Sequence, residues 1–450
     1  MKLRNIRRKV LSCATLIGLF ALSLSGCTTG GSSSTGGGGG GRAACTVNPH
    51  VSGQARWTVL VFMNAANNLQ PDSLLNVAQM ASVGSDANLN IIVQWKQANC
   101  VDCGSPSFQA TKRYRITKHT QAEVNSIAAG DTSSLTRDEL APPANFYDPV
   151  TQQADMGDWR VLHDFASWGA ANYPADHLMA LMWDHGAGWR PTRALNKLRP
   201  VFRGFSEDNA TNNEVQTWEI PTALAGLAQP VDLLAFDCSL MQMMEVAYEA
   251  RNSARVLVGS EESPPGAGYR YDLWLSQLKS SAADPCTAAS NIQTTFVNYY
   301  VANRPDFHNI TQSIIDLSKM QSVGSALNTF GRELQRVKTT EATQIQSARN
   351  SAQHYAYFDN KDLYHYAALI GGSTGSASLK QAVSDLQSTL TGTNGAVITN
   401  MRGSTGQSNS NGLAVYVPTP SAFLNAYGNL ALSKAGAAPE WMAFLQAQTR

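Results

Sequence analysis

Continuous apolar runs alternate with amphipathic segments along most of the chain. Trp57–Met63 is an apolar, β-branched run typical of a strand buried on both faces, and Leu89–Trp95 and His177–Trp183 have similar character. Between them, Pro71–Val83 and Trp159–Tyr173 carry apolar residues at helical spacing. Strands that alternate with helices predict an α/β fold, with a mostly parallel sheet and helices on both faces.

Further segments complete this pattern. We predict an edge strand at 112–117, strands at 232–236 and 255–260, and helices at 220–228 and 240–251. The last third repeats the mixture more weakly, with strand candidates at 311–317 and 412–417 and helices at 318–337, 378–390 and 439–448. We therefore expect a core over residues 55–286 and a C-terminal α/β region over residues 287–450 that packs on it.

Polar clusters follow three of the predicted strands directly. They are Asp184-His185-Gly186, Asp237-Cys238-Ser239 and Ser260-Glu261-Glu262. In parallel sheets the carboxyl ends of the strands meet at one edge, and that edge carries the chemistry. The sequence therefore predicts a functional site where these three clusters converge.

The residue types in these clusters suit nucleophilic catalysis. A thiolate such as that of Cys238 attacks a carbonyl well when an imidazole such as that of His185 takes its proton. Gly186 lets the backbone approach a substrate and offers an N–H group for an oxyanion hole. The alternative is structural. His185 would then be a histidine at a strand end whose hydrogen bonds are satisfied within the fold, and Cys238 would be a small buried apolar residue.

The N-terminus has the three sections of an export signal. Met1–Lys9 is basic, and Val10–Leu24 is apolar but too short to span a bilayer comfortably. The next residues end at Cys27 and resemble a bacterial lipobox, in which the thiol is acylated; a plain secretory signal is the alternative. We predict a signal peptide over residues 1–26 and a lipidated Gly/Ser-rich tether over residues 27–54, which would anchor an exported head to the cell envelope, at the outer membrane or cell surface.

Removal of this signal changes the charge balance. The whole chain has 34 Lys and Arg against 33 Asp and Glu, but five of the basic residues and no acidic residue lie in positions 1–26. The remaining 29 basic residues face 33 acidic ones. A mildly acidic chain lacks the concentrated basic footprint that phosphate binding needs, so we exclude nucleic acid as the main partner.

The cysteines divide by context. In an oxidising compartment Cys45, Cys100, Cys103 and Cys286 can form two disulfides, with three possible pairings. Cys100 and Cys103 form a CxxC, but their flanks read as loop, so we favour a structural staple over a redox-active motif. The acidic residues show no compact metal-binding spacing, and we predict no metal site from the residues themselves.

Four ordered blocks, WTVLVFMNAANNL, HLMALMWDHGAGW, LLAFDCSLMQMMEVAYEA and VLVGSEESPPGAGYRYD, resemble the clostripain-like cysteine peptidases, family C11. The resemblance implies a caspase-like α/β fold and hydrolysis of peptide bonds after Arg or Lys in peptide or protein substrates. It implies His185 as general base and Asp237 as part of an acidic S1 pocket, with Glu261 or Glu262 contributing. It also implies calcium as the one candidate cofactor.

The nucleophile motif departs from the family pattern by one position. The family reads Phe-Asp-Ala-Cys-Leu-Met, whereas this chain reads Phe-Asp-Cys-Ser-Leu-Met over residues 236–241. A one-residue step near a strand end turns a side chain to the other face. Three possibilities follow: Cys238 acts after a local backbone shift, Ser239 acts in its place, or the site is inactive. The first hypothesis is an envelope-anchored endopeptidase with a Cys/His mechanism, and the second is a catalytically inactive relative that binds peptides or envelope partners.

Overall fold

The computed structural model describes residues 44–447, apart from 144, 194–199, 203, 305, 308 and 404. The predicted signal peptide and the predicted lipidation site, Cys27, lie outside the described residues. Within the described part of the chain, none of the helices combines the length and the apolar character that a membrane crossing requires.

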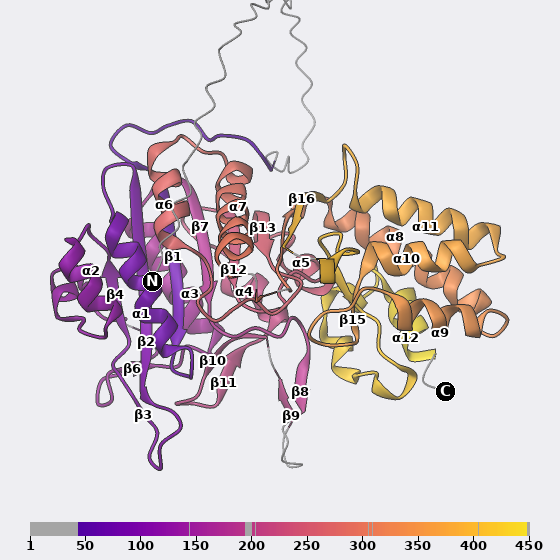
Figure 1. The fold of residues 1–450 in the computed structure, drawn as a ribbon, viewed down its shortest axis with the longest axis horizontal. Coiled ribbons are helices and arrows are strands. Elements are labelled where there is room, and N and C mark those ends of the chain that lie inside the picture. Colours follow the sequence, from indigo (N-terminus) through magenta and orange to yellow (C-terminus); the bar gives the residue numbers. More distant parts are fainter. Residues whose placement is uncertain are drawn as a thin grey trace, which may run out of the picture. The chain divides into compact units, whose positions relative to one another are not determined.

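A nine-stranded sheet forms the centre of the fold (Figure 1). Strand β1 (Ala55–Ala65) lies between β2 (Leu89–Cys100) and β7 (Ala175–Trp183), and β12 (Val231–Asp237) and β13 (Ala254–Gly259) continue beyond β7. Each of these neighbouring pairs is parallel. The mostly parallel sheet that the sequence predicts is therefore confirmed.

Antiparallel strands close both edges of this sheet. At one edge β3 (Ser107–Phe108) and β4 (Lys112–Arg115) pair with β2. At the other edge β14 (Thr311–Asp316) pairs with β13, and β16 (Val397–Arg402) pairs with β14. The chain also forms short hairpins: β5 (Tyr147–Asp148) with β6 (Gln153–Ala154), β8 (Pro191–Arg193) with β9 (Pro200–Phe202), β10 (Phe205–Asp208) with β11 (Asn213–Val215), and β15 (Asn360–Asp362) with β17 (Ala414–Tyr416).

Helices cover both faces of the sheet, as predicted. They are α1 (Gln70–Val83), α2 (Gln121–Ala128), α3 (Trp159–Asn172), α4 (Ile220–Ala223), α5 (Met244–Ala250), α6 (Tyr271–Ser280), α7 (Pro285–Asn303), α8 (Met320–Val337), α9 (Ala342–Ser351), α10 (Leu363–Ser373), α11 (Ala377–Leu390) and α12 (Pro439–Ala447). Successive side chains of a strand point to opposite faces. In β1, Leu60 and Phe62 pack in the core that contains α3 and α5, whereas Val59 and Val61 pack in the core that contains α1, α6 and α7.

The C-terminal region is continuous with the core. Helices α8 to α12, orange to yellow in Figure 1, gather together, and α8 packs against both α11 and α12. The same region supplies β14 and β16 to the central sheet. The predicted boundary after residue 286 falls inside α7, because that helix begins at Pro285 and runs to Asn303.

Two disulfides pair the four cysteines that were predicted to be structural. Cys45 bonds to Cys286, with Cα atoms 5.0 Å apart, and so fastens the start of the described chain to the first turn of α7. Cys100 bonds to Cys103 in the turn between β2 and β3. The CxxC thus lies in a hairpin and does not open a helix, which supports the structural interpretation.

Candidate active site

The ends of β7 and β12 bring the predicted residues into one pocket. Trp183, the last residue of β7, lies beside Asp237, the last residue of β12. Because the two strands are parallel, the residues that follow them emerge at the same edge of the sheet. His185, Asp237, Cys238 and Ser239 all line a pocket of about 170 Å³ there.

A glycine permits the close approach of the two loops. A Cβ atom on Gly186 would lie 2.4 Å from the carbonyl oxygen of Ser239 and 2.9 Å from the Cβ of Cys238. Gly186 also forms an isolated antiparallel bridge with Phe205 in β10. The backbone after His185 is therefore held between β10 and the residues that follow β12.

The loop that follows β1 orients His185. The imidazole Nε2 lies 2.8 Å from the side-chain oxygen of Asn68. An amide oxygen only accepts hydrogen bonds, so in this assignment Nε2 carries the proton, and Nδ1 is the basic nitrogen of the neutral ring. Asp184 accepts hydrogen bonds of 2.6 Å at Oδ1 from both the His185 backbone N–H and Asn67 Nδ2.

Neither Asn67 nor Asn68 was singled out as a site residue from the sequence. Their position in a loop directly after the first buried strand was the signal, since that strand ends at the same edge of the sheet as β7.

The thiol of Cys238 belongs to the core. Leu234, Phe236 and Cys238 follow the alternation of β12 and pack in the same apolar cluster. Cys238 is only 1% exposed, and its Sγ donates a hydrogen bond of 3.3 Å to the carbonyl oxygen of Met182. Burial raises the pKa of this thiol well above its ordinary value, and the charges of Asp184 and Asp237 raise it further. This environment disfavours the thiolate that nucleophilic attack requires.

Ser239 is partly exposed in the pocket. Its hydroxyl hydrogen-bonds with that of Ser263 over 2.9 Å. The next residue, Leu240, has a φ of 64°, a left-handed conformation that is uncommon for a leucine, and its N–H donates to the carbonyl oxygen of Glu262. The helix predicted over residues 240–251 is present, but its predicted start is wrong, because this left-handed turn delays α5 until Met244.

Asp237 forms the acidic part of the pocket. Its Oδ2 accepts hydrogen bonds from the backbone N–H of Tyr269 at 3.0 Å and from the Tyr271 hydroxyl at 2.9 Å. Burial raises the pKa of Asp237 to about 7, and the negative charge of Asp72 adds to the rise. Gly268 has a φ of +57° and packs directly against the Asp237 carboxylate. A Cβ atom at position 268 would lie 2.6 Å from both carboxylate oxygens, so this close contact requires a glycine.

Glu261 and Glu262 do not line this pocket, which corrects the prediction that they help to form an S1 site. Both are buried against the C-terminal region. Glu261 Oε1 accepts a hydrogen bond of 2.7 Å from the Tyr355 hydroxyl, and Glu262 Oε1 accepts one of 2.9 Å from the Ala356 N–H. Both carboxylates lie after the end of β13, where the chain turns into the C-terminal region, and they find their hydrogen-bond partners there.

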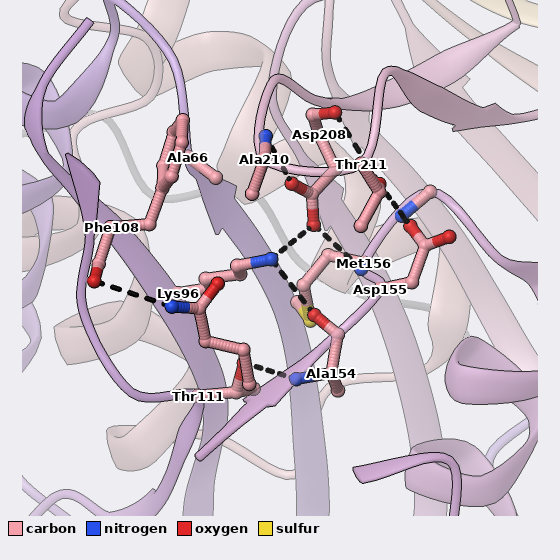
Figure 2. Close-up of polar contacts among 12 residues, drawn as sticks. Ala66, Lys96, Phe108, Thr111, Ala154, Asp155, Met156, Asp208, Ala210 and Thr211 are labelled. Atoms are coloured by element: carbon pink, nitrogen blue, oxygen red, sulfur yellow. Dashed lines mark hydrogen bonds and ion pairs between the residues drawn. The ribbon is translucent and has the colours of Figure 1, made fainter. Parts of the chain in front are cut away.

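A buried ion pair joins β2 to β10, the strand that contacts Gly186 (Figure 2). Lys96 in β2 and Asp208 in β10 are both fully buried, with Nζ and Oδ2 2.7 Å apart. As Figure 2 shows, Lys96 Nζ also donates to the carbonyl oxygen of Ala154, over 3.0 Å. The residue before Asp208, Glu207, accepts a hydrogen bond from Asn67 through its carbonyl oxygen. The ion pair thus anchors the segment against which the Asn67 side chain rests.

The described residues hold no cluster of three or more carboxylates for the calcium that the resemblance implies. In the described chain the group of potential metal ligands close enough to share an ion consists of Cys45, Asp284 and Cys286. Its two sulfur atoms are joined in a disulfide. Calcium takes six or more oxygen ligands, so this group does not suit it, and we route no step of the function through calcium.

Solved structures with a similar fold are described as C11 proteases. A secreted C11 cysteine protease from Bacteroides thetaiotaomicron in complex with an irreversible peptide inhibitor aligns over 87% of this chain and 99% of its own, with a TM-score of 0.56 and 19% identity. An inactive zymogen C11 protease from Parabacteroides distasonis aligns over 85% of this chain and 98% of its own, with a TM-score of 0.58 and 17% identity. At these identities the likeness establishes the fold.

The sequence itself matches more specifically. Clostripain from Hathewaya histolytica is 26% identical over 339 residues, which is 69% of this chain and 60% of that protein. The chain thus spans about three fifths of the length of this curated relative. The model of the clostripain family, peptidase C11, matches residues 61–443. The chain belongs to the clostripain family.

Proposed function

We propose that this protein is an endopeptidase that cleaves peptide bonds after Arg or Lys. The observation that carries this proposal is the buried carboxylate of Asp237 in a pocket that also holds His185 and Ser239. A partly desolvated carboxylate is the natural partner for a guanidinium or an ammonium group. The peptide bond that follows such a side chain would lie near the pocket entrance, within reach of the residues that end β7 and β12.

Ser239 is the nucleophile in this proposal, since the Cys238 thiol is committed to the core. The hydroxyl oxygen attacks the scissile carbonyl carbon while its proton passes to His185 Nδ1, and the N–H group of Gly186 stabilises the oxyanion. The carbon–nitrogen bond then breaks, the amine leaves with the proton from His185, and water hydrolyses the resulting ester by the same steps. Asn68 holds the imidazole, as the third member of a Cys-His-Asn triad does.

The second candidate function is peptide binding without cleavage. It is favoured by the residue type at position 239, because a hydroxyl is far less acidic than the thiol that the family uses. The hydrogen bond between the Ser239 and Ser263 hydroxyls also favours this second candidate. Ser239 must give up that bond before its hydroxyl can reach the imidazole. In this case Asp237 would recognise the basic side chain of a peptide that is held and released intact.

We also propose export and lipid anchoring through Cys27. The basic and apolar sections that precede this cysteine support the proposal, as does the description of the Bacteroides thetaiotaomicron relative as secreted. An anchored head would act on peptides at the envelope. Radiolabelled palmitate that appears in the unaltered protein but not in a Cys27→Ala variant would verify the anchor.

The enzyme is tested with fluorogenic peptides that end in Arg or Lys, under reducing and calcium-supplemented conditions. We expect turnover by the unaltered chain, loss of turnover in Ser239→Ala and His185→Ala, and retention in Cys238→Ala. Binding of a basic peptide without turnover would establish the second candidate. Loss of turnover in Cys238→Ala alone would identify the thiol as nucleophile.

A further inference from the structure

The segment that leads into β1 lies outside the sheet. Residues 45–54, which we call the strap, belong to no helix or strand. In the middle of the strap, Asn48 donates from Nδ2 to the carbonyl oxygen of Asp176 over 2.6 Å, and its backbone N–H donates to His177 Nε2 over 3.1 Å. Asp176 and His177 lie near the start of β7. The strap is therefore held at the amino end of this strand, at the edge of the sheet opposite the candidate active site.

A disulfide closes the first end of the strap. Cys45 is bonded to Cys286, which lies 241 positions later in the first turn of α7. The predicted lipidation site, Cys27, precedes the strap in the sequence, whereas β1 follows it. Two covalent paths thus join Cys27 to the head, one along the backbone of the strap and one through the disulfide.

The strap is accessible to proteases. Val47 and Val51 are 48% and 50% exposed, and Ser52 and Gly53 are exposed as well. Gly53 has a φ of +85°, and a Cβ atom there would meet nothing within 4 Å. Exposed loop tips with small residues are preferred sites of proteolytic cleavage. If the backbone were the only covalent path, one cut in the strap would end the covalent connection between the head and Cys27.

We propose that the strap and its disulfide form a redox-gated attachment of the head. A cut within residues 46–54 leaves the head joined to Cys27 through the bond between Cys45 and Cys286, and release requires reduction of that bond as well. This inference rests on the proposed lipid anchor at Cys27 and is independent of the proposed peptidase activity.

The reducing step is thiol–disulfide exchange with a dithiol. Cys45 is exposed and Cys286 is half-buried, so the thiolate of the reductant attacks the Cys45 sulfur. The sulfur–sulfur bond breaks, and Cys286 leaves as a thiolate that takes up a proton. The second thiol of the reductant then displaces Cys45 and gives it a proton, so the dithiol supplies two electrons and ends as a disulfide. No covalent bond then holds the cut strap, and its hydrogen bonds exchange with those of water.

The test inserts the recognition sequence of a sequence-specific protease between Ser52 and Gly53 of the full chain, in membrane vesicles from cells that export the protein. After cleavage without reductant, we expect the head to sediment with the vesicles. After addition of dithiothreitol, we expect the head in the supernatant. A denaturing gel run with reductant verifies that the strap has been cut, and thermal unfolding verifies the fold of each uncut variant.

Two controls isolate the disulfide. The first carries the same insertion between Ala43 and Ala44, before the strap, and should release the head on cleavage without reductant. The second combines the strap insertion with Cys45→Ser and Cys286→Ser, and should also release the head without reductant. If the serine variant does not fold, the first control still gives the comparison.

The outcomes separate this gate from the anchor. If the uncut protein does not sediment with the vesicles, the anchor is wrong and the gate is overturned with it. If the uncut protein sediments but the cut strap variant is released without reductant, the gate is overturned while the anchor stands. Retention after both cleavage and reduction also overturns the gate, because hydrogen bonds would then suffice to hold the head.

Discussion

Gly186 lies directly against the backbone of Ser239, and a Cβ atom at Gly186 would stand 2.4 Å from the Ser239 carbonyl oxygen. The obstacle is backbone, which cannot swing aside as the tip of a flexible side chain can. The spacing between the histidine loop and the proposed nucleophile therefore depends on the absence of a side chain at position 186.

We expect Gly186→Ala to lower kcat/KM about a hundredfold, because the two loops must separate and a displacement of about 1 Å at reacting groups costs about that much. Gly104→Ala is the matched control, since a Cβ there meets nothing within 4 Å. Kinetics with an Arg-ended fluorogenic peptide measures the effect. Unchanged turnover in Gly186→Ala would show that the loops are not held at this distance during the reaction.

The sequence located the site but misjudged which side chains enter it. Apolar runs placed β1, β7 and β12, and the carboxyl ends of parallel strands then placed His185 beside Asp237. Strand alternation, read from Phe236, also indicates that Cys238 faces away from Asp237. The direction of Ser239 was not predictable in this way, since the left-handed conformation of Leu240 is a backbone choice that tertiary contacts impose.

Long-range partners were the other limit. Glu261 and Glu262 follow a strand end just as His185 does, yet contacts with residues about a hundred positions later hold them in the interior. The Lys96–Asp208 pair joins residues 112 positions apart, and neither residue is unusual in its local context. Such pairings depend on which segments the folded sheet brings together, and periodicity carries no information about them.

Cys238→Ala should leave kcat/KM within about twofold of the unaltered value. The thiol packs among apolar side chains and takes no part in the proposed reaction, so its removal costs about 1 kcal/mol of stability through lost packing. Peptide kinetics together with urea unfolding separates the two effects. A loss of activity without a loss of stability would argue that a backbone shift carries the thiol into the pocket.

Ser239→Cys places the thiol where the family has it. Because a thiol near an imidazole ionises far more readily than a hydroxyl, we expect a rise in turnover of at least tenfold under reducing conditions. Inactivation by a thiol alkylating agent should appear in this variant, with Cys238→Ala present to remove the buried thiol as a second target. If the double variant is no more active than the unaltered chain, residue 239 is not the attacking group.

Binding of n-butylguanidinium, a cation that resembles the Arg side chain and cannot be cleaved, should strengthen as the pH rises through about 7, where Asp237 loses its proton in the folded protein. Stability should respond in the opposite direction. The pKa of Asp237 in the unfolded chain is near 3.8, so the folded state binds more protons between about 4 and 7, and the contribution of this group falls as the pH rises through that window.

Asp237→Asn separates these effects, because it removes the titrating group and keeps an oxygen that accepts from Tyr269 and Tyr271. We expect the variant to lose ligand binding at every pH and to be more stable than the unaltered chain at pH 8, by on the order of a few kcal/mol. Glu245 and Glu249 also have a pKa raised to about 7 by burial, so the remaining pH dependence belongs to such groups. A variant with the same stability difference at pH 5 and pH 8 would contradict the assignment.

Lys96→Met should destabilise the fold by about 3–5 kcal/mol, because it leaves the Asp208 carboxylate buried without its cation. Asp208→Asn alone strands the ammonium group in the same way. The double variant Lys96→Met with Asp208→Asn removes both charges, and we expect it to recover about half or more of the stability that the two single variants lose together. Urea unfolding of the four proteins gives this coupling directly. If the stability loss of the double variant equals the sum of the two single losses, the two charges are not coupled. Each charge would then be neutralised by its backbone partners, and the ion pair would not hold β10 beside the site.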